Sequence, residues 1–296
     1  MPEGAYLLLP SGLVPYAEAL ELQRSLAGAV SQGAIPETVI LLEHRPVVTL
    51  GRRTELEREL HVPDDADVEI AETDRGGKST FHGPGQLVCY PILDLGRHGK
   101  DVKLYVRTLE DALIRTLAAF ELEGTRIDGL TGVWMTPRGG RGPRKIASIG
   151  VHVSRWVTTH GYALNVDLDP APFTEWITAC GLEDAAFTTM ARELGRPLTV
   201  EDVRPAAISA LEEVFDLDLE ELPHDEGTGL WMQPIHEHTG ERDTIVVCLE
   251  GEGFTSVAGE EAPLREGQQA RWPKGAPHRL WTEGSTMRTL MIERFD

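Results

Sequence analysis

The twelve residues RGGKSTFHGPGQ, at positions 75–86, contain four glycines and a proline among basic, hydroxyl and histidine side chains. A plain surface turn needs one or two such residues. A glycine-rich run of this length predicts a backbone that lies close against something other than itself, because glycine lets main chain approach without side-chain obstruction. We therefore take this loop as the first candidate for a binding site.

The segments on both sides of the loop read as strands. DVEIAETDR (67–75) alternates apolar and polar residues into the loop, and LVCYPILDL (87–95) leaves it as a continuous apolar run. PYAEALELQRSLAGAV (15–30) has helical spacing, and KIASIGVHVS (145–154) and YALNVDLD (162–169) again resemble strands. The pattern predicts a mixed α/β domain in which the loop joins two strands of a sheet.

Composition narrows the class of protein. The chain has 296 residues, 41% of them hydrophobic, and a formal net charge of −20, which opposes nucleic acid and anionic membrane as main partners because their phosphates would be repelled. No apolar run approaches the roughly 18–20 residues that span a bilayer, and the N-terminus lacks the features of a signal peptide. We expect a soluble, cytoplasmic protein.

Three cysteines, Cys89, Cys180 and Cys248, are widely spaced. Their odd number and spacing predict neither a disulfide framework nor a CxxC metal site, so at least one is a candidate working thiol. A basic island, PRGGRGPRK (137–145), interrupts the acidic chain. It is read either as a solvated loop or as a dock for an acidic partner.

Three further segments stand out in the same region. KIASIGV (145–151) places Lys145 at the head of a strand, THGYALNV (159–166) places His160 and a glycine before another, and ITACGL (177–182) sets Cys180 beside a glycine. Each is weak alone, since a cysteine in apolar surroundings is usually a small core residue and a lysine usually faces solvent. In order, and together with the glycine-rich loop, they are much more specific.

Over about residues 5–222 these motifs resemble the octanoyltransferases of lipoate biosynthesis. The resemblance implies an α/β (α+β) catalytic domain with the fold of biotin and lipoate protein ligases. It also implies transfer of an octanoyl group from acyl carrier protein to a lysine on lipoyl domains of 2-oxoacid dehydrogenases and of the glycine cleavage H protein, without a cofactor. Cys180 matches the family's acyl acceptor and Lys145 its assisting lysine, although Ala179 stands where the family usually has proline.

The resemblance also assigns the acyl-binding segments. They correspond to Arg75, Gly76, Gly77, Lys78, Ser79, Thr80, Phe81, His82, Ser148, Ile149, Gly150, Gly161, Tyr162 and Ala163. His82 and His160 could orient groups there, or serve as hydrogen-bonded structural histidines.

The residue types suit this chemistry independently of the resemblance. A cysteine thiolate divides acyl transfer between a thiol and an amine into two easier steps. A nearby cation favours the thiolate, and an ammonium group can also relay protons. The alternative is an ATP-dependent ligase for lipoate or fatty acid, or an acyl-binding protein of the same fold, in which Cys180 is incidental.

The acidic stretch EEVFDLDLEELPHDEGTG (212–229), with its proline and glycines, marks a domain boundary. We divide the chain there into residues 1–224 and 225–296. The second part resembles an all-β cupin barrel: GQQARWPKGAPH (267–278) fits the family's second motif and IHEHTGERD (235–243) resembles its first. The matching metal ligands are His236, His238, Asp243 and His278, for zinc, iron, nickel or manganese. The alternative is a barrel that has lost its metal. In either case, we expect the cupin domain to regulate, sense or stabilise.

Overall fold

The computed structural model describes residues 3–33, 35–55, 60–63, 65–137, 142–177, 186–222, 238–239, 243–281 and 287–293. Within these ranges no helix is both long enough and apolar enough to cross a membrane.

The N-terminal domain is built on a 10-stranded mixed sheet in which most strands follow the order β13-β1-β3-β7-β11-β10-β9-β8, while β2 pairs with β3 and β12 with β10. Its strands are β1 (Glu3–Leu8), β2 (Leu13–Val14), β3 (Thr38–His44), β7 (Gln86–Ile92), β8 (Gly124–Ile127), β9 (Leu130–Met135), β10 (Arg144–Ser154), β11 (Val157–Asn165), β12 (Ala186–Phe187) and β13 (Leu217–Glu221). A small second sheet contains β4 (Val47–Leu50), β5 (Glu69–Glu72) and β6 (Thr80–His82). The glycine-rich segment was predicted to join two strands of one sheet, and this was wrong: β5 and β6 belong to the small sheet, whereas β7 belongs to the large sheet. The segment itself contains β6 and leads from the small sheet into the large one.

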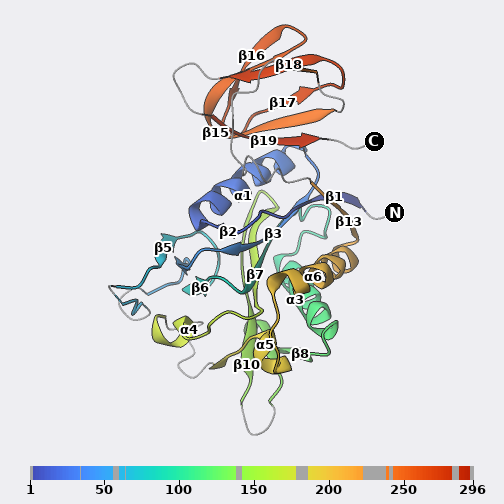
Figure 1. Ribbon diagram of the computed structural model, residues 1–296. Coiled ribbons are helices and arrows are strands. Elements are labelled where there is room, and N and C mark those ends of the chain that lie inside the picture. The colour runs from blue at the N-terminus through green and yellow to red at the C-terminus, as the bar shows by residue number, and fades with distance from the viewer. Residues whose placement is uncertain are drawn as a thin grey trace.

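Helices cover both faces of the large sheet (Figure 1). The helices are α1 (Tyr16–Ser31), α3 (Val102–Ala118), α4 (Pro172–Glu175), α5 (Met190–Leu194) and α6 (Val200–Phe215). Strand alternation sends Val39 and Leu41 of β3 to the face under α3 and α6, and Ile40 and Leu42 to the face under α1. The sheet is thus buried on both sides, which explains the continuous apolar run in β7.

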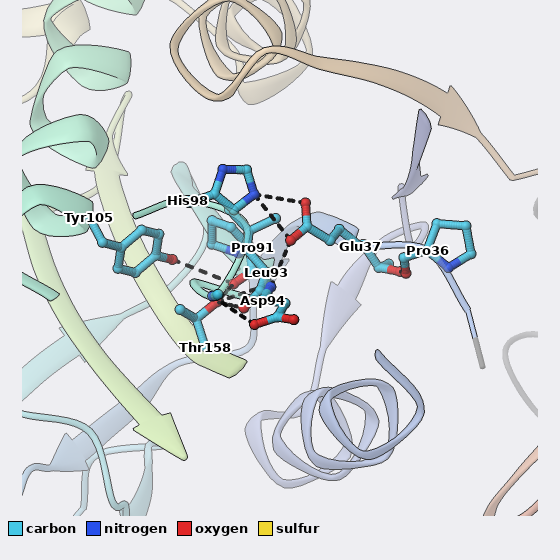
Figure 2. Close-up of polar contacts among 10 residues, drawn as sticks. Pro36, Glu37, Pro91, Leu93, Asp94, His98, Tyr105 and Thr158 are labelled. Carbon is cyan, nitrogen blue, oxygen red and sulfur yellow. Dashed lines mark hydrogen bonds and ion pairs between the residues drawn. The ribbon is translucent and has the colours of Figure 1, made fainter. Parts of the chain in front are cut away.

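A buried polar cluster holds the chain between β7 and α3 (Figure 2). Glu37 is 2% exposed, and its carboxylate accepts hydrogen bonds from the Asp94 N–H at 2.7 Å and from His98 Nε2 at 2.9 Å. Thr158 of β11 donates through Oγ1 to the carbonyl of Pro91 at 2.6 Å and accepts from the N–H of Leu93 at 2.9 Å. These bonds satisfy polar groups that burial would otherwise leave unpaired, and they fix the entry to α3.

The described part of the C-terminal domain consists of antiparallel strands. They are β14 (His238–Thr239), β15 (Thr244–Val257), β16 (Glu260–Arg265), β17 (Gln269–Trp272), β18 (Pro277–Trp281) and β19 (Met287–Glu293). The long strand β15 pairs with β16, β17, β18 and β19. The domain has its own apolar core, formed by Val246, Cys248, Leu264, Trp272, Leu280 and Met287. A second apolar cluster joins this domain to α1.

Candidate active site

A cavity of about 460 Å³ lies where the glycine-rich loop crosses the large sheet. Its floor is built from small residues, because Ser148 and Gly150 of β10 pair directly with Ala163 and Gly161 of β11. Paired residues on neighbouring strands share a face, so the floor carries no bulky side chains at these four positions. A floor with small residues at these four positions leaves room for an extended apolar chain.

Gly161 is the tightest point of the floor. A Cβ atom at this position would lie 2.2 Å from the carbonyl oxygen of Cys89 and 2.7 Å from Cδ of Pro91. Because backbone and a proline ring cannot move aside cheaply, Gly161→Ala is expected to lower the free energy of unfolding by about 2–3 kcal/mol. Gly28→Ala is the control, since a Cβ there meets nothing within 4 Å. It should stabilise α1 by roughly 0.5–1 kcal/mol. Denaturant unfolding measures both, and equal stability of the two variants would contradict the steric argument.

The wall of the cavity is the glycine-rich loop, which is held in shape by Arg75. The Arg75 guanidinium donates to the carbonyl of Thr49 at 2.8 Å and, turning back, to the carbonyl of Lys78 at 2.7 Å. The N–H of Gly76 donates to the carbonyl of Val151 on β10 at 3.0 Å, and Gly77 has φ +99°, which a side chain would strain. The cluster of glycines therefore serves a close approach of this loop to β10.

The structure brings most of the sequence-predicted site residues together. Lining the cavity are Arg75, Gly76, Gly77, Lys78, Ser79, Thr80, His82, Lys145, Ser148, Ile149, Gly150, Gly161, Tyr162 and Ala163. Phe81 does not join them. Because neighbouring residues of β6 point to opposite sides, His82 reaches the cavity while Phe81 packs edge-on against Phe173 and Trp176 in a separate apolar cluster.

Three buried histidines lie at or beside one end of the cavity. His44 donates from Nδ1 to the carbonyl of Val14 at 2.9 Å and accepts at Nε2 from the Tyr90 hydroxyl at 2.7 Å, while His82 Nδ1 lies 2.7 Å from Gln86 Oε1. Burial lowers the pKa of His44 and of His160 to about 4, and it lowers the pKa of His82 well below its ordinary value. All three are neutral near pH 7, so they present polar but uncharged groups to this end of the cavity.

Lys145 lies at the start of β10. It is 4% exposed, and Nζ lies 5.3 Å from the centroid of the Trp134 ring. Gly132 makes room for it, since a Cβ there would come within 2.9 Å of Lys145 Cε. The preceding residue, Arg144, is also buried and its guanidinium binds both carboxylate oxygens of Glu193 at 2.9 Å. Arg144 is therefore not part of a free basic island, and Arg138 and Arg141 lie outside the described residues.

Cys180 also lies outside the described residues. The described chain ends at Ile177 and resumes at Ala186, where β12 pairs with β10 so that Phe187 stands opposite Lys145. The described chain that follows Cys180, at Ala186 and Phe187, therefore lies beside Lys145 in the sheet. The other two cysteines are buried: Cys89 in the sheet, where burial raises the pKa of its thiol, and Cys248 in the C-terminal core.

Of the four metal ligands expected in the C-terminal domain, the structure describes the side chains of two, Asp243 and His278. His236 lies outside them, and of His238 only the backbone is described, paired with His278. His278 donates from Nδ1 to the carbonyl of Ala276 at 2.9 Å and stacks on Trp272. Asp243 accepts hydrogen bonds from the N–H of Lys274 at 2.8 Å and from Arg271 at 2.5 Å, so a cation already neutralises it. No cluster of three ligating side chains forms among the described residues.

Sequence patterns did not point to several cavity residues. Tyr16, Tyr90 and Trp134 line the cavity from α1, β7 and β9. Each is an aromatic residue within an ordinary helix or strand pattern, and such residues are usually core. Only the folded arrangement shows that they border the site.

Comparison with known proteins supports the assignment of both domains. Residues 15–212 match the family model for the lipoyl protein ligase A/B catalytic domain, and residues 227–293 match the cupin domain. An octanoyltransferase from Chloroflexus aggregans is 46% identical over 210 residues, which make up 70% of this chain and 93% of the relative. An octanoyltransferase from Mycobacterium tuberculosis is 49% identical over 206 residues, 69% of this chain and 85% of the relative.

Among solved structures, the fold is shared with a bi-partite lipoate protein ligase from Thermoplasma acidophilum. The TM-score is 0.58 at 18% identity, covering 76% of this chain and 89% of the other. A lipoate-protein ligase A bound with ATP gives a TM-score of 0.55 at 17% identity, covering 76% of this chain and 90% of the other. These structures show the shared fold, whereas the family models and the sequence relatives show that the chain belongs to the octanoyltransferase family and carries a C-terminal cupin domain.

Proposed function

We propose that this octanoyltransferase works through a thioester on Cys180, taking the octanoyl group from acyl carrier protein and passing it to a lysine of a lipoyl domain. The observation that carries the proposal is the cavity itself, with its floor of small residues and with Lys145 in its lining. Cys89 and Cys248 are both buried, which leaves Cys180 as the candidate for an accessible thiol.

The reaction has two balanced steps. In the first, the Cys180 thiolate attacks the carbonyl carbon of the octanoyl thioester, the bond to the carrier sulfur breaks, and the carrier leaves as a thiol after taking a proton. In the second, the neutral acceptor amine attacks the new thioester, an amide forms, the bond to the Cys180 sulfur breaks, and Cys180 is released as the thiolate. Lys145 would give the proton in the first step and receive one in the second. No cofactor enters this balance.

The neutral histidines fit the same proposal. An octanoyl chain is apolar, and a charge in the cavity would have to be desolvated when the chain enters. His82 and His160 line the cavity as neutral groups near pH 7. As neutral groups they keep their hydrogen bonds to neighbouring residues, and they cost less desolvation than charged groups when an apolar chain enters.

The acceptors we propose are lipoyl domains of 2-oxoacid dehydrogenases and the glycine cleavage H protein, with octanoyl acyl carrier protein as donor. The competing reaction is ATP-dependent ligation of free acid, because the same fold occurs in a lipoate-protein ligase bound with ATP. The two reactions require different co-substrates, which makes them separable in one assay.

The decisive experiment mixes the full-length chain with a lipoyl domain and either octanoyl carrier protein alone or octanoate with ATP. We expect intact mass to show one octanoyl group on the lipoyl domain in the first mixture only. Without acceptor, the enzyme should gain one octanoyl group, which peptide mapping should place on Cys180. Modification that needs octanoate and ATP, with none from the carrier, would overturn transfer in favour of ligation.

A further inference from the structure

Helix α1 contributes two side chains to the neighbourhood of the cavity. Tyr16 lines it, donates from its hydroxyl to Thr73 Oγ1 at 3.0 Å and stacks on His82. Gln23, two turns later, is fully buried, and its Oε1 accepts from the main-chain N–H of His160 at 2.6 Å. Within the described residues its Nε2 has no hydrogen-bond partner. Burial of this amide group therefore costs free energy of desolvation that no hydrogen bond offsets.

The backbone conformation of His160 gives the contact with Gln23 its significance. It has φ +57° in the middle of β11, a left-handed conformation that is uncommon outside glycine and costs on the order of 1 kcal/mol or more. Such a residue persists only where its surroundings enforce it. Two contacts do so here: Gln23 holds its N–H, and Asp74 Oδ1 lies 2.8 Å from its Nε2. Because Gly161 follows directly, the conformation of His160 sets the floor of the cavity.

The other side of α1 is covered by the cupin domain (Figure 1). Along β15 the side chains alternate: Val246 and Cys248 enter the barrel core, whereas Ile245, Val247 and Leu249 join the cluster that contains α1. Leu290 of β19 joins the same cluster. The outer face of this cupin sheet is therefore an apolar interface.

A hydrogen bond fixes the register of this interface. Ser25 Oγ of α1 donates to the carbonyl of Leu249 at 3.2 Å in a buried position. Ser25 stands two residues after Gln23, so the same turns of α1 contact the cupin sheet on one side and His160 on the other. The Chloroflexus aggregans relative is matched over 93% of its length by 210 residues, which leaves it no room for such a domain. The contact of the cupin sheet with α1, which we call the clamp, is therefore an addition in the present chain.

We propose that Gln23 is a positioning residue for octanoyl transfer and that the cupin domain holds it in place by clamping α1. The inference rests on the acyl cavity of the proposed function. A rigid apolar interface transmits a displacement of the barrel to the helix, because packed side chains do not deform continuously. Displacing α1 would release the N–H of His160 and change the floor at Gly161.

The first test compares two substitutions of Gln23 in the full-length chain. Gln23→Met keeps the length but removes the acceptor, whereas Gln23→Glu keeps an oxygen acceptor at the same reach. We expect kcat/KM for octanoyl carrier protein to fall about tenfold or more in Gln23→Met, and less in Gln23→Glu. The ratio of octanoyl to decanoyl transfer should change in Gln23→Met, because a shifted floor fits chain lengths differently. A merely structural role would lower both rates equally, and an unchanged ratio would overturn the assignment.

The second test disturbs the clamp from each side. Leu290→Asp places a carboxylate against α1, and its control is Met291→Asp, because Met291 is the next residue and is 47% exposed. Ser25→Leu pushes the barrel away without altering the barrel sequence, and Gly28→Ala is its control on the same helix. Both disturbing variants should shift the octanoyl to decanoyl ratio in the same direction as Gln23→Met, and both controls should match the wild type.

Hydrogen exchange of the His160 amide provides a readout that needs no substrate. We expect exchange to accelerate at least about tenfold in Leu290→Asp, Ser25→Leu and Gln23→Met, and not to accelerate in the controls. Unchanged exchange in Leu290→Asp and Ser25→Leu would show that the barrel does not hold Gln23. Since exchange is measured on the unliganded protein, failure of the clamp is distinguishable from failure of the proposed acyl transfer.

Discussion

The Cys180→Ala variant is expected to gain no octanoyl group from octanoyl carrier protein and to lose at least about 10³-fold in turnover. The reason is chemical: without a thiol, the two-step route through a thioester disappears, and the acceptor amine must attack the carrier thioester directly. Intact mass of the enzyme after mixing with the donor gives the first result, and octanoylation of a lipoyl domain gives the second.

Cys89→Ala is the matched control. Cys89 is fully buried in the sheet and burial raises the pKa of its thiol, so it should not form the thioester. The Cys89→Ala variant should therefore gain one octanoyl group as the wild type does. A stable thioester adduct on the Cys180→Ala variant, mapped to either remaining cysteine, would refute the assignment of Cys180.

The sequence was sufficient to predict the glycine-rich segment and the strands on both sides of it, because glycine clusters and strand alternation are local signals. It did not show that these strands belong to two different sheets, because strand pairing depends on distant segments. It predicted that Arg75 through His82 act together, and the structure places all but Phe81 at one cavity. Phe81 differs because strand alternation turns every second residue of β6 away, and the exact bounds of such a short strand are not visible in the sequence.

The sequence contains no comparable local pattern for contacts between segments that are far apart in the chain. Arg144 reads as part of a basic island, yet it pairs with Glu193, which is 49 residues away. The run Ile245 to Leu249 is apolar at every position, a pattern typical of a strand that is buried on both faces. That pattern indicates that another element covers the second face of the strand, but it does not show which one. Only the fold identifies that element as α1.

The Lys145→Ala variant is expected to keep its fold and to lose roughly two or more orders of magnitude in transfer rate, as for removal of a positioned acid or base. Lys145 is 4% exposed and lies over Trp134, so truncation also leaves a small void beside that ring. Unfolding by denaturant must therefore accompany the kinetics, because a large loss of stability would explain a lower rate without any role in proton transfer.

Lys145→Arg separates the two roles proposed for the lysine. Arginine keeps a positive charge, which favours the Cys180 thiolate, but its pKa lies above 12, so it neither gives nor takes up a proton. We expect this variant to form the octanoyl thioester at a rate closer to the wild type than Lys145→Ala does, and to be slow in passing the group to the acceptor amine, which must lose a proton. Rapid mixing with intact-mass detection resolves the two steps. If Lys145→Ala stayed within about tenfold of the wild type in both, the lysine would be a structural neighbour of Trp134, and proton transfer would have to be assigned to another group at the cavity.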